Sequence, residues 1–166
     1  MSMTNQGLNI ELQKMEKLIQ AGPAIAAQAL YKGAGVLAAE YQKALAGMPT
    51  EANRFVQPGD PPRHATVAEK NVLLRSLGIA KFRKDPDSVD TSVGLNNSGY
   101  AENIRTEKYP GGKPVPLIAN GINSGSSFII KYPFKRMAEA AGVKKALAAA
   151  DAEAQKLLDE VTNKNG

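Results

Sequence analysis

The sequence predicts an α+β fold in which a small, mainly antiparallel sheet of about four strands packs against a long N-terminal helix and a C-terminal helix. Two observations favour this class. Apolar residues recur at helical spacing toward both ends of the chain, whereas the middle holds short apolar runs separated by Gly, Pro, Asn and Ser. The four expected strands comprise residues 79–83, 89–95, 115–121 and 128–131.

The length of 166 residues predicts a single domain. We expect it to span residues 1–166, with extended loops near 49–66 and 96–114. The chain has no Cys and one His, His64, which excludes disulfides, thiolate metal sites, cysteine nucleophiles and sites that need two imidazoles. Since it shows neither a signal-peptide pattern nor an apolar run near the ~20 residues of a membrane span, we expect a soluble protein made in the cytosol.

Two helices are predicted at the N-terminus. The first carries an apolar stripe from Leu8 to Ile19, and Gly22-Pro23 is expected to interrupt it. Pro23 then begins a longer helix that Pro49 ends. Its stripe, typical of an amphipathic helix pair or of a dedicated interface, consists of Ala26, Leu30, Gly33, Leu37, Tyr41, Ala44 and Met48. A glycine there costs about 1 kcal/mol of helix propensity relative to alanine, so we expect another backbone to approach Gly33 closely.

A proline-rich loop and a short helix follow. Residues 57–63 hold three prolines and a glycine, which indicates a loop. Thr66 and Glu69 then have the spacing of a capping box, which predicts a helix over residues 67–77 that Gly78 closes.

The turn expected at residues 84–88 is rich in carboxylates, namely Asp85, Asp87 and Asp90 nearby. An EF-hand-like calcium loop counted from Asp85 needs Gly at its sixth position and Glu at its twelfth. Asp90 and Asn96 stand there instead, so we interpret the segment as a solvated turn.

The polar, glycine-rich segment 96–114 has no firm secondary-structure prediction. Long loops of this kind in compact domains are commonly functional or disordered. Its candidate partner-contact residues are Arg105, Lys108, Tyr109 and Lys113. Basic residues there suit weak phosphate contacts to DNA, and a Tyr beside an Arg suits a protein interface, which we favour.

The C-terminal helix is expected to begin at Pro133, with Phe134 as the core anchor that fixes it to the sheet. Met137, Ala138 and Ala141 continue the stripe of Phe134. A second stripe, a possible oligomer face, consists of Val143, Leu147, Ala150, Ala154, Leu157 and Val161. The two stripes point in opposite directions on one continuous helix. Either Gly142 breaks the helix so that both stripes face one core, or the helix continues and its C-terminal half packs on a surface other than that core.

The sequence holds none of the common catalytic signatures. A phosphate-binding Gly-rich loop is missing, and Gly121-Ile-Asn-Ser-Gly125 has its Ser at the wrong position for a nucleophile elbow. His64 lies in the proline loop without an evident partner, so we interpret it as a surface residue. We therefore expect no enzyme, no cofactor and no metal.

From Leu74-Arg75-Ser76-Leu77 onward, the order of segments resembles a family of small tail-completion or head–tail joining proteins of long-tailed, siphovirus-type bacteriophages and prophages. That pattern has an alanine-rich helix ending in a proline, a Leu-Arg segment leading into strands, an apolar strand ending near a glycine, and a Pro-Phe start to an alanine-rich helix. In this chain these features are Pro49, residues 74–77, Leu117 to Gly121, and Pro133-Phe134. The chain departs from the pattern in its longer 50–66 loop and in Asn120, where the family often has Glu.

The resemblance implies a structural virion protein, synthesised in the bacterial cytoplasm, that forms an oligomeric ring at the neck or tail-tube junction. The ring is a hexamer by family analogy. Its implied partners are other neck and tail-tube proteins, with double-stranded DNA passing through and bound non-specifically at most. The alternative is a small basic nucleic-acid-binding module, acting as monomer or dimer. It is suggested by the net charge of +5 and by a basic cluster of Lys70, Arg75, Lys81, Arg83 and Lys84.

Overall fold

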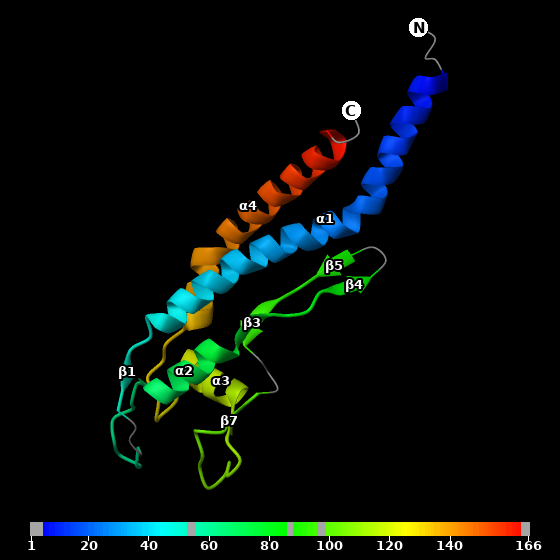
Figure 1. The fold of residues 1–166 in the computed structure, drawn as a ribbon. Coiled ribbons are helices and arrows are strands. Elements are labelled where there is room, and N and C mark those ends of the chain that lie inside the picture. The colour runs from blue at the N-terminus through cyan, green and yellow to red at the C-terminus, as the bar shows by residue number, and fades with distance from the viewer. Residues whose placement is uncertain (1–4, 53–55, 86–87, 96–98, 164–166) are drawn as a thin grey trace.

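The computed structural model describes residues 5–52, 56–85, 88–95 and 99–163 as an elongated body dominated by two long helices (Figure 1). The helices in this part of the chain are α1 (Asn5–Ala46), α2 (Val67–Ser76), α3 (Val115–Ser124) and α4 (Phe134–Asn163). The strands are β1 (Thr50–Glu51), β2 (Ala65–Thr66), β3 (Leu77–Ile79), β4 (Arg83–Asp85), β5 (Ser88–Asp90), β6 (Val93–Leu95), β7 (Tyr100–Ala101) and β8 (Lys113–Pro114). The predicted α+β class is confirmed.

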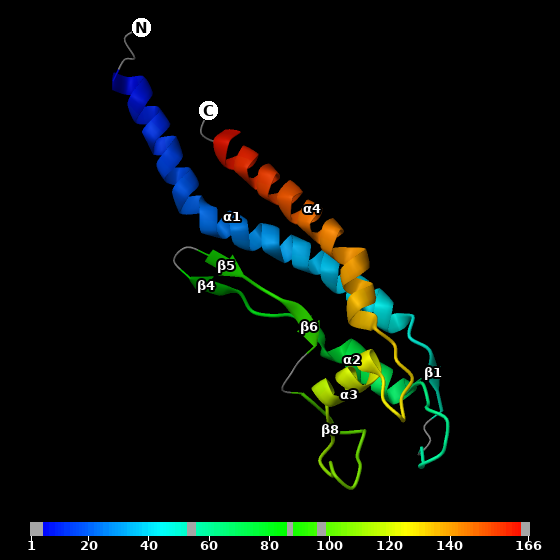
Figure 2. The same cartoon turned by 180° about the vertical axis from the view of Figure 1, so that it is seen from behind.

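The strands form two-stranded ladders instead of the predicted single sheet of about four strands. β3 pairs antiparallel with β6 and β4 with β5, so residues 77–85 and 88–95 are the two arms of one long hairpin that lies along α1 in both ribbon views (Figures 1 and 2). Between the two ladders, Ala80 N donates to Ser92 O at 2.8 Å. β7 pairs antiparallel with β8, and β1 pairs parallel with β2. The prediction of strands at 79–83 and 89–95 was therefore right about the hairpin and wrong about its bounds.

The other two predicted strands were wrong. Residues 115–121 belong to α3, where Val115, Ile118, Ala119 and Ile122 are buried at helical spacing. A proline in the first turn suits a helix start, since its missing N–H has no partner there in any case. Residues 128–131 form no strand, and Ile129 makes only an isolated parallel bridge with Arg63. A short apolar run is compatible with either a strand or a helix. In residues 115–121 the helix forms because it buries one apolar face against the core.

The predicted interruption at Gly22-Pro23 was also wrong, because α1 continues through both residues. A proline inside a helix removes one backbone hydrogen bond and crowds the preceding turn, which bends the helix. α1 does change direction in its N-terminal half (Figure 1). In α2, the predicted helix and capping box are confirmed, but the helix ends at Ser76, and Gly78 lies within β3.

α1 and α4 run antiparallel and side by side, and glycines let them approach closely (Figure 2). A Cβ built on Gly33 would lie 2.7 Å from the backbone oxygen of Ala146 and 3.1 Å from the Cβ of Ala150. The close backbone approach predicted at Gly33 is therefore confirmed. Gly142 does not break α4; a Cβ there would lie 2.9 Å from Leu37 Cδ1, so this glycine serves the same contact.

Polar side chains add to this helix pair along its length. Tyr41 Oη donates to Glu139 Oε1 at 3.0 Å, and Lys145 Nζ donates to Glu40 Oε1 at 3.1 Å. Burial, together with the hydrogen bond to the Glu139 carboxylate, raises the pKa of Tyr41 to about 12. The pair therefore combines close small-residue packing with hydrogen bonds between α1 and α4.

The main hydrophobic core lies where the C-terminal part of α1 meets α2, α3 and the start of α4. Phe134 is fully buried there, and its burial agrees with its expected role as anchor. Its neighbours in the cluster come mainly from helices, not from a sheet as predicted. The largest fully buried apolar side chains besides Phe134 are Leu45, Leu73, Ile118, Ile122 and Val115.

We expect Phe134→Ala to lower the free energy of unfolding by about 3–5 kcal/mol, because it empties the centre of the core. Chemical denaturation followed by circular dichroism measures this change. A loss below about 1 kcal/mol would show that α4 is held mainly by its contact with α1.

Gly33→Ala and Gly35→Ala form a matched pair of substitutions in α1. A Cβ at Gly33 meets the Ala146 backbone oxygen, whereas nothing lies within 4 Å of a Cβ at Gly35. Gly35→Ala should stabilise the protein by up to about 1 kcal/mol through helix propensity. Gly33→Ala should instead destabilise it by about 1–3 kcal/mol, since the two helices must move apart. Equal stabilisation of both variants in thermal denaturation would contradict the close helix contact.

Candidate functional site

A capping box at the start of α2 brings a carboxylate into the interior. Thr66 adopts an extended N-cap conformation, and Glu69 N donates to its Oγ1 at 3.1 Å. The Glu69 carboxylate accepts a hydrogen bond from Thr66 N at 2.9 Å. Glu69 is only 2% exposed. A buried carboxylate needs a cationic partner or several donors to offset its desolvation.

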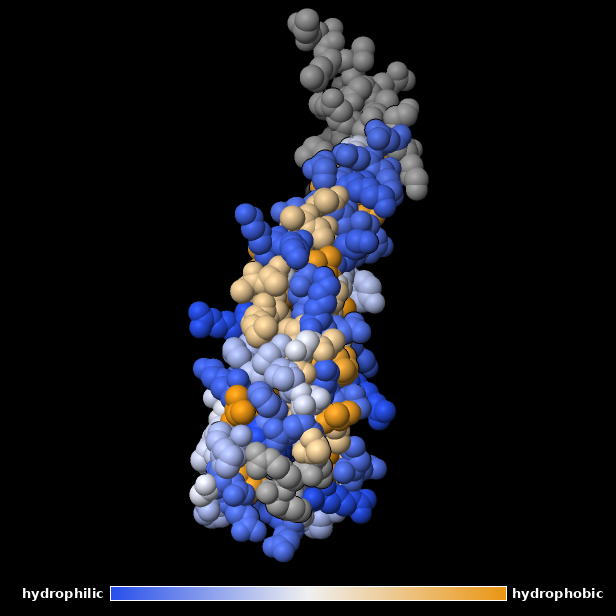
Figure 3. All heavy atoms as spheres, turned by 90° about the vertical axis from the view of Figure 1, so that its left-hand side faces the viewer, coloured by the Kyte–Doolittle hydropathy of each residue, from blue (hydrophilic) through white to orange (hydrophobic). Residues whose placement is uncertain are grey.

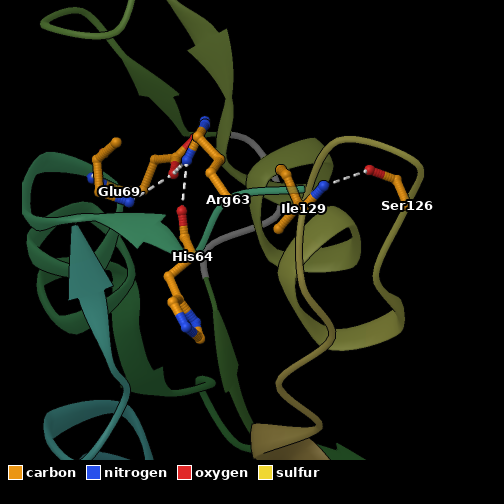
Figure 4. A network of polar contacts seen from close by, with 6 residues as sticks. Arg63, His64, Glu69, Ser126 and Ile129 are labelled. Carbon is orange, nitrogen blue, oxygen red and sulfur yellow. Dashed lines mark hydrogen bonds and ion pairs between the residues drawn. The ribbon is translucent and has the colours of Figure 1, made fainter. Parts of the chain in front are cut away.

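Arg63 supplies that partner (Figure 4). Its Nη1 and Nη2 donate to the two carboxylate oxygens of Glu69 at 2.8 and 2.9 Å, and Nη1 also donates to His64 O at 2.9 Å. The guanidinium is mostly buried. Two parallel hydrogen bonds of this kind fix the orientation of both side chains. Sequence reasoning identified Glu69 from the capping box and missed Arg63, since nothing in the spacing of a loop residue marks it as an ion-pair partner.

The backbone of Arg63 extends this network to the segment after α3. Arg63 N donates to Phe128 O at 2.9 Å, and Ile130 N donates to Arg63 O at 2.8 Å. Ser126 Oγ accepts from Phe128 N and Ile129 N at 3.2 and 3.1 Å. Figure 4 shows the contact between Ser126 and Ile129 beside Arg63 and the ion pair. These hydrogen bonds thus connect the proline-rich loop, α2 and residues 126–130 into one wall.

The electrostatics of the pair are set by competing effects. Burial raises the pKa of Glu69, but the hydrogen bonds from Arg63 and Thr66 outweigh it and hold that pKa below its usual value. The hydrogen bonds to Glu69 raise the pKa of Arg63, against burial. Both groups are therefore charged over the physiological range.

The segment that sequence analysis left without secondary structure is folded in residues 99–114. The β7–β8 ladder closes it, and Thr106 forms a bridge with Tyr109. Gly112 has φ +120°, and a Cβ there would lie 2.7 Å from the Ala101 backbone oxygen, so only glycine fits this turn. The Lys108 ammonium lies 5.7 Å from the centre of the Tyr109 ring.

This loop, the Arg63–Glu69 wall and the residues around α3 enclose a cleft of about 760 Å³, which we call the basic cleft. All four predicted partner-contact residues line it, namely Arg105, Lys108, Tyr109 and Lys113. Leu117 and Phe128 also line it and are 42% and 48% exposed. Four cationic side chains and a single carboxylate, that of Glu69, are in the described lining. Such a cleft suits a ligand that carries both negative charge and an apolar group.

A second, smaller feature is an apolar groove of about 290 Å³ between α1, α4 and the hairpin. Leu30, Leu37 and Val93 line it together with Val143 and Leu147 of the predicted oligomer face, of which Leu147 is 63% exposed. Ala150 lines it too but packs against Gly33 of the same chain, and Ala154, Leu157 and Val161 are half-buried. Apolar patches stand among polar residues on the face seen in Figure 3.

The other sequence-predicted positions are dispersed. In the basic cluster, Lys70 Nζ donates to the carbonyl oxygens of Ala46 and Met48 at 2.6 and 3.1 Å, which satisfies the end of α1. Arg83 lies 3.7 Å from Asp90 across the hairpin. Asp87 of the carboxylate turn lies outside the described residues, and no group of three or more possible metal ligands occurs among the residues searched. His64 is half-buried.

Comparison with family models, curated proteins and solved structures finds no match to this chain. None of the helices in the described part of the chain is long and apolar enough to cross a membrane.

We expect Glu69→Gln to lower the free energy of unfolding at pH 7 by about 3 kcal/mol, because it leaves the Arg63 guanidinium buried without its counter-charge. Glu102→Gln in the exposed part of the loop is the control and should change it by less than about 0.5 kcal/mol.

The two variants should also differ in acid. The folded-state pKa of Glu69 is below its unfolded value, so its stabilisation is present above about pH 4.3 and is lost as pH falls through the folded pKa. Urea titrations between pH 2 and 7 should therefore show a flatter acid limb for Glu69→Gln than for the wild type. An unchanged acid limb would show that Glu69 does not have a depressed pKa.

Proposed function

We propose that this chain is a structural bacteriophage virion protein that assembles into a ring at the head–tail junction and acts in tail completion or head–tail joining, without catalysis. The proposal joins the family resemblance of the sequence to one observation on the structure. The groove between α1, α4 and the hairpin leaves Val143 and Leu147 exposed beside other apolar residues. A surface of this kind supports self-association, because burying it removes apolar area from water.

The basic cleft supports the second half of the proposal, which is contact with another component. A joining ring must bind itself and a neighbouring neck or tail-tube protein. Tyr and Arg are prominent in protein interfaces, and Tyr109 and Arg105 both line the cleft. DNA passing through the ring would meet these residues with weak, sequence-independent phosphate contacts at most. The ring order of six comes from the family analogy.

Leu147→Glu tests self-association, with Ala148→Glu as the matched control. Both positions are exposed on α4, but only Leu147 lines the apolar groove. Light scattering after size exclusion should give an oligomer for the wild type and for Ala148→Glu, and a monomer for Leu147→Glu, since a charge would be buried in an apolar contact. Rings should be visible by electron microscopy for the first two. A wild-type monomer at every concentration would contradict the ring.

The particle itself tests the location. In the phage or prophage that encodes the chain, deletion should yield separate heads and tails, and mass spectrometry of complete wild-type particles should detect the protein at the junction. Complete infectious particles without it would contradict the proposal.

A basic nucleic-acid-binding module is the second candidate, and the Arg105, Lys108 and Lys113 side chains of the basic cleft favour it, since the fourth cation, Arg63, is paired with Glu69. It predicts a monomer or dimer that shifts double-stranded DNA with an affinity falling steeply as salt rises. Lys108→Glu would then weaken the shift, whereas Leu147→Glu would leave it unchanged.

A further inference from the structure

We infer that the basic cleft of one copy receives the acidic, C-terminal part of α4 from a second copy, so that copies join head to tail. The inference rests on the proposed self-assembly and names a specific contact within it. It follows from two surfaces of the same chain that carry opposite charge and that both expose apolar side chains.

The donor surface is one side of the C-terminal half of α4. Leu158 and Asp159 follow Asp151 by seven and eight residues, so the three side chains lie within one stripe about 100° wide along the helix. Ala146 and Ala150 pack toward α1, and Asp159 lies on the opposite side of α4 from Ala150, whereas Leu158, eight residues after Ala150, stands at the edge of the face nearest α1. Both aspartates are exposed, and Leu158 is 38% exposed. The face thus presents two carboxylates about 12 Å apart along the axis, with the leucine beside the second of them.

The acceptor surface has the complementary composition. The Arg105, Lys108 and Lys113 side chains line the cleft, and the Glu69 carboxylate in its lining is already bound by Arg63. Leu117 and Phe128 offer an exposed apolar area beside these cations. Charge complementarity orients such a contact, and the leucine supplies apolar burial that a phosphate backbone lacks. For this reason the acidic helix is favoured over DNA as the occupant.

The positions of the two surfaces determine the kind of assembly. The loop that carries the cleft and the end of α4 lie at opposite ends of the elongated body (Figure 1). A contact between different surfaces of identical copies is heterologous, and repetition closes it into a ring or extends it into a filament. The cleft–helix contact therefore supplies a directional link of the kind that a ring needs.

Charge reversal on each side tests the contact. The helix-reversed variant is Asp151→Lys/Asp159→Lys, and the cleft-reversed variant is Arg105→Glu/Lys108→Glu. Each should raise the concentration at which half of the protein is assembled by at least about tenfold, because like charges then meet across the interface. A mixture of the two variants should assemble again, since each reversed cleft can bind a reversed helix. Light scattering over a concentration series measures all three.

Glu160→Lys, measured beside Asp159→Lys, is the matched control, because both positions are exposed on the same helix and the change in net charge is the same. It should assemble like the wild type. Asp151→Asn/Asp159→Asn, which only neutralises the donor face, should weaken assembly in the same direction by less, so the inference stays testable if the reversed helix folds poorly.

Each other outcome points to a different failure. If the wild type assembles and the helix-reversed and cleft-reversed variants assemble as well as the wild type, this inference is overturned but the ring is not. The same holds if the two variants dissociate and their mixture also stays dissociated. A cleft-reversed variant that loses DNA binding but assembles normally would assign the cleft to nucleic acid and overturn it too. A wild type that never assembles would contradict the ring itself.

Discussion

The close contact between α1 and α4 is the constraint on which the rest of the structure depends. These helices lie at the two ends of the sequence, and the hairpin and the two short helices are held against them (Figures 1 and 2). Gly33 and Gly142 allow the contact, because a Cβ at either position would meet atoms of the opposite helix at less than 3 Å. Close approach increases the number of dispersion contacts per residue, which matters in a chain with few aromatic side chains.

The second organising interaction is the buried Arg63–Glu69 pair. A buried ion pair adds little net stability over apolar residues of similar size. It does hold its two side chains in one arrangement, because separating them would leave an unpaired charge in the interior. Here it joins the proline-rich loop, the start of α2 and the segment after α3 into the wall of the basic cleft. The chain thus holds an apolar groove and a basic cleft, which we propose as surfaces for association, on a frame made of close-packed helices.

Sequence reasoning predicted the features that depend on neighbours along the chain. The capping box at Thr66 and Glu69, the long terminal helices, the hairpin and the α+β class all follow from local chemistry and periodicity. It also singled out Arg105, Lys108, Tyr109 and Lys113, because a polar loop with aromatic and basic residues is conspicuous between apolar segments; all four line the basic cleft, and their role in partner contact stays a prediction. It failed for residues 115–121 and 128–131, where a short apolar run has no distinguishing period and burial against other elements decides.

By itself, then, the sequence determined the capped start of α2, the α+β class and which loops are basic, since these depend on side chains within a few positions of one another. Only the tertiary structure decided that α1 continues through Pro23, that Gly142 lies within a continuous α4, and that Arg63 is the partner of Glu69. These outcomes depend on atoms brought together from distant parts of the chain. The same holds for the basic cleft, whose lining residues come from separate segments that meet only in the folded molecule.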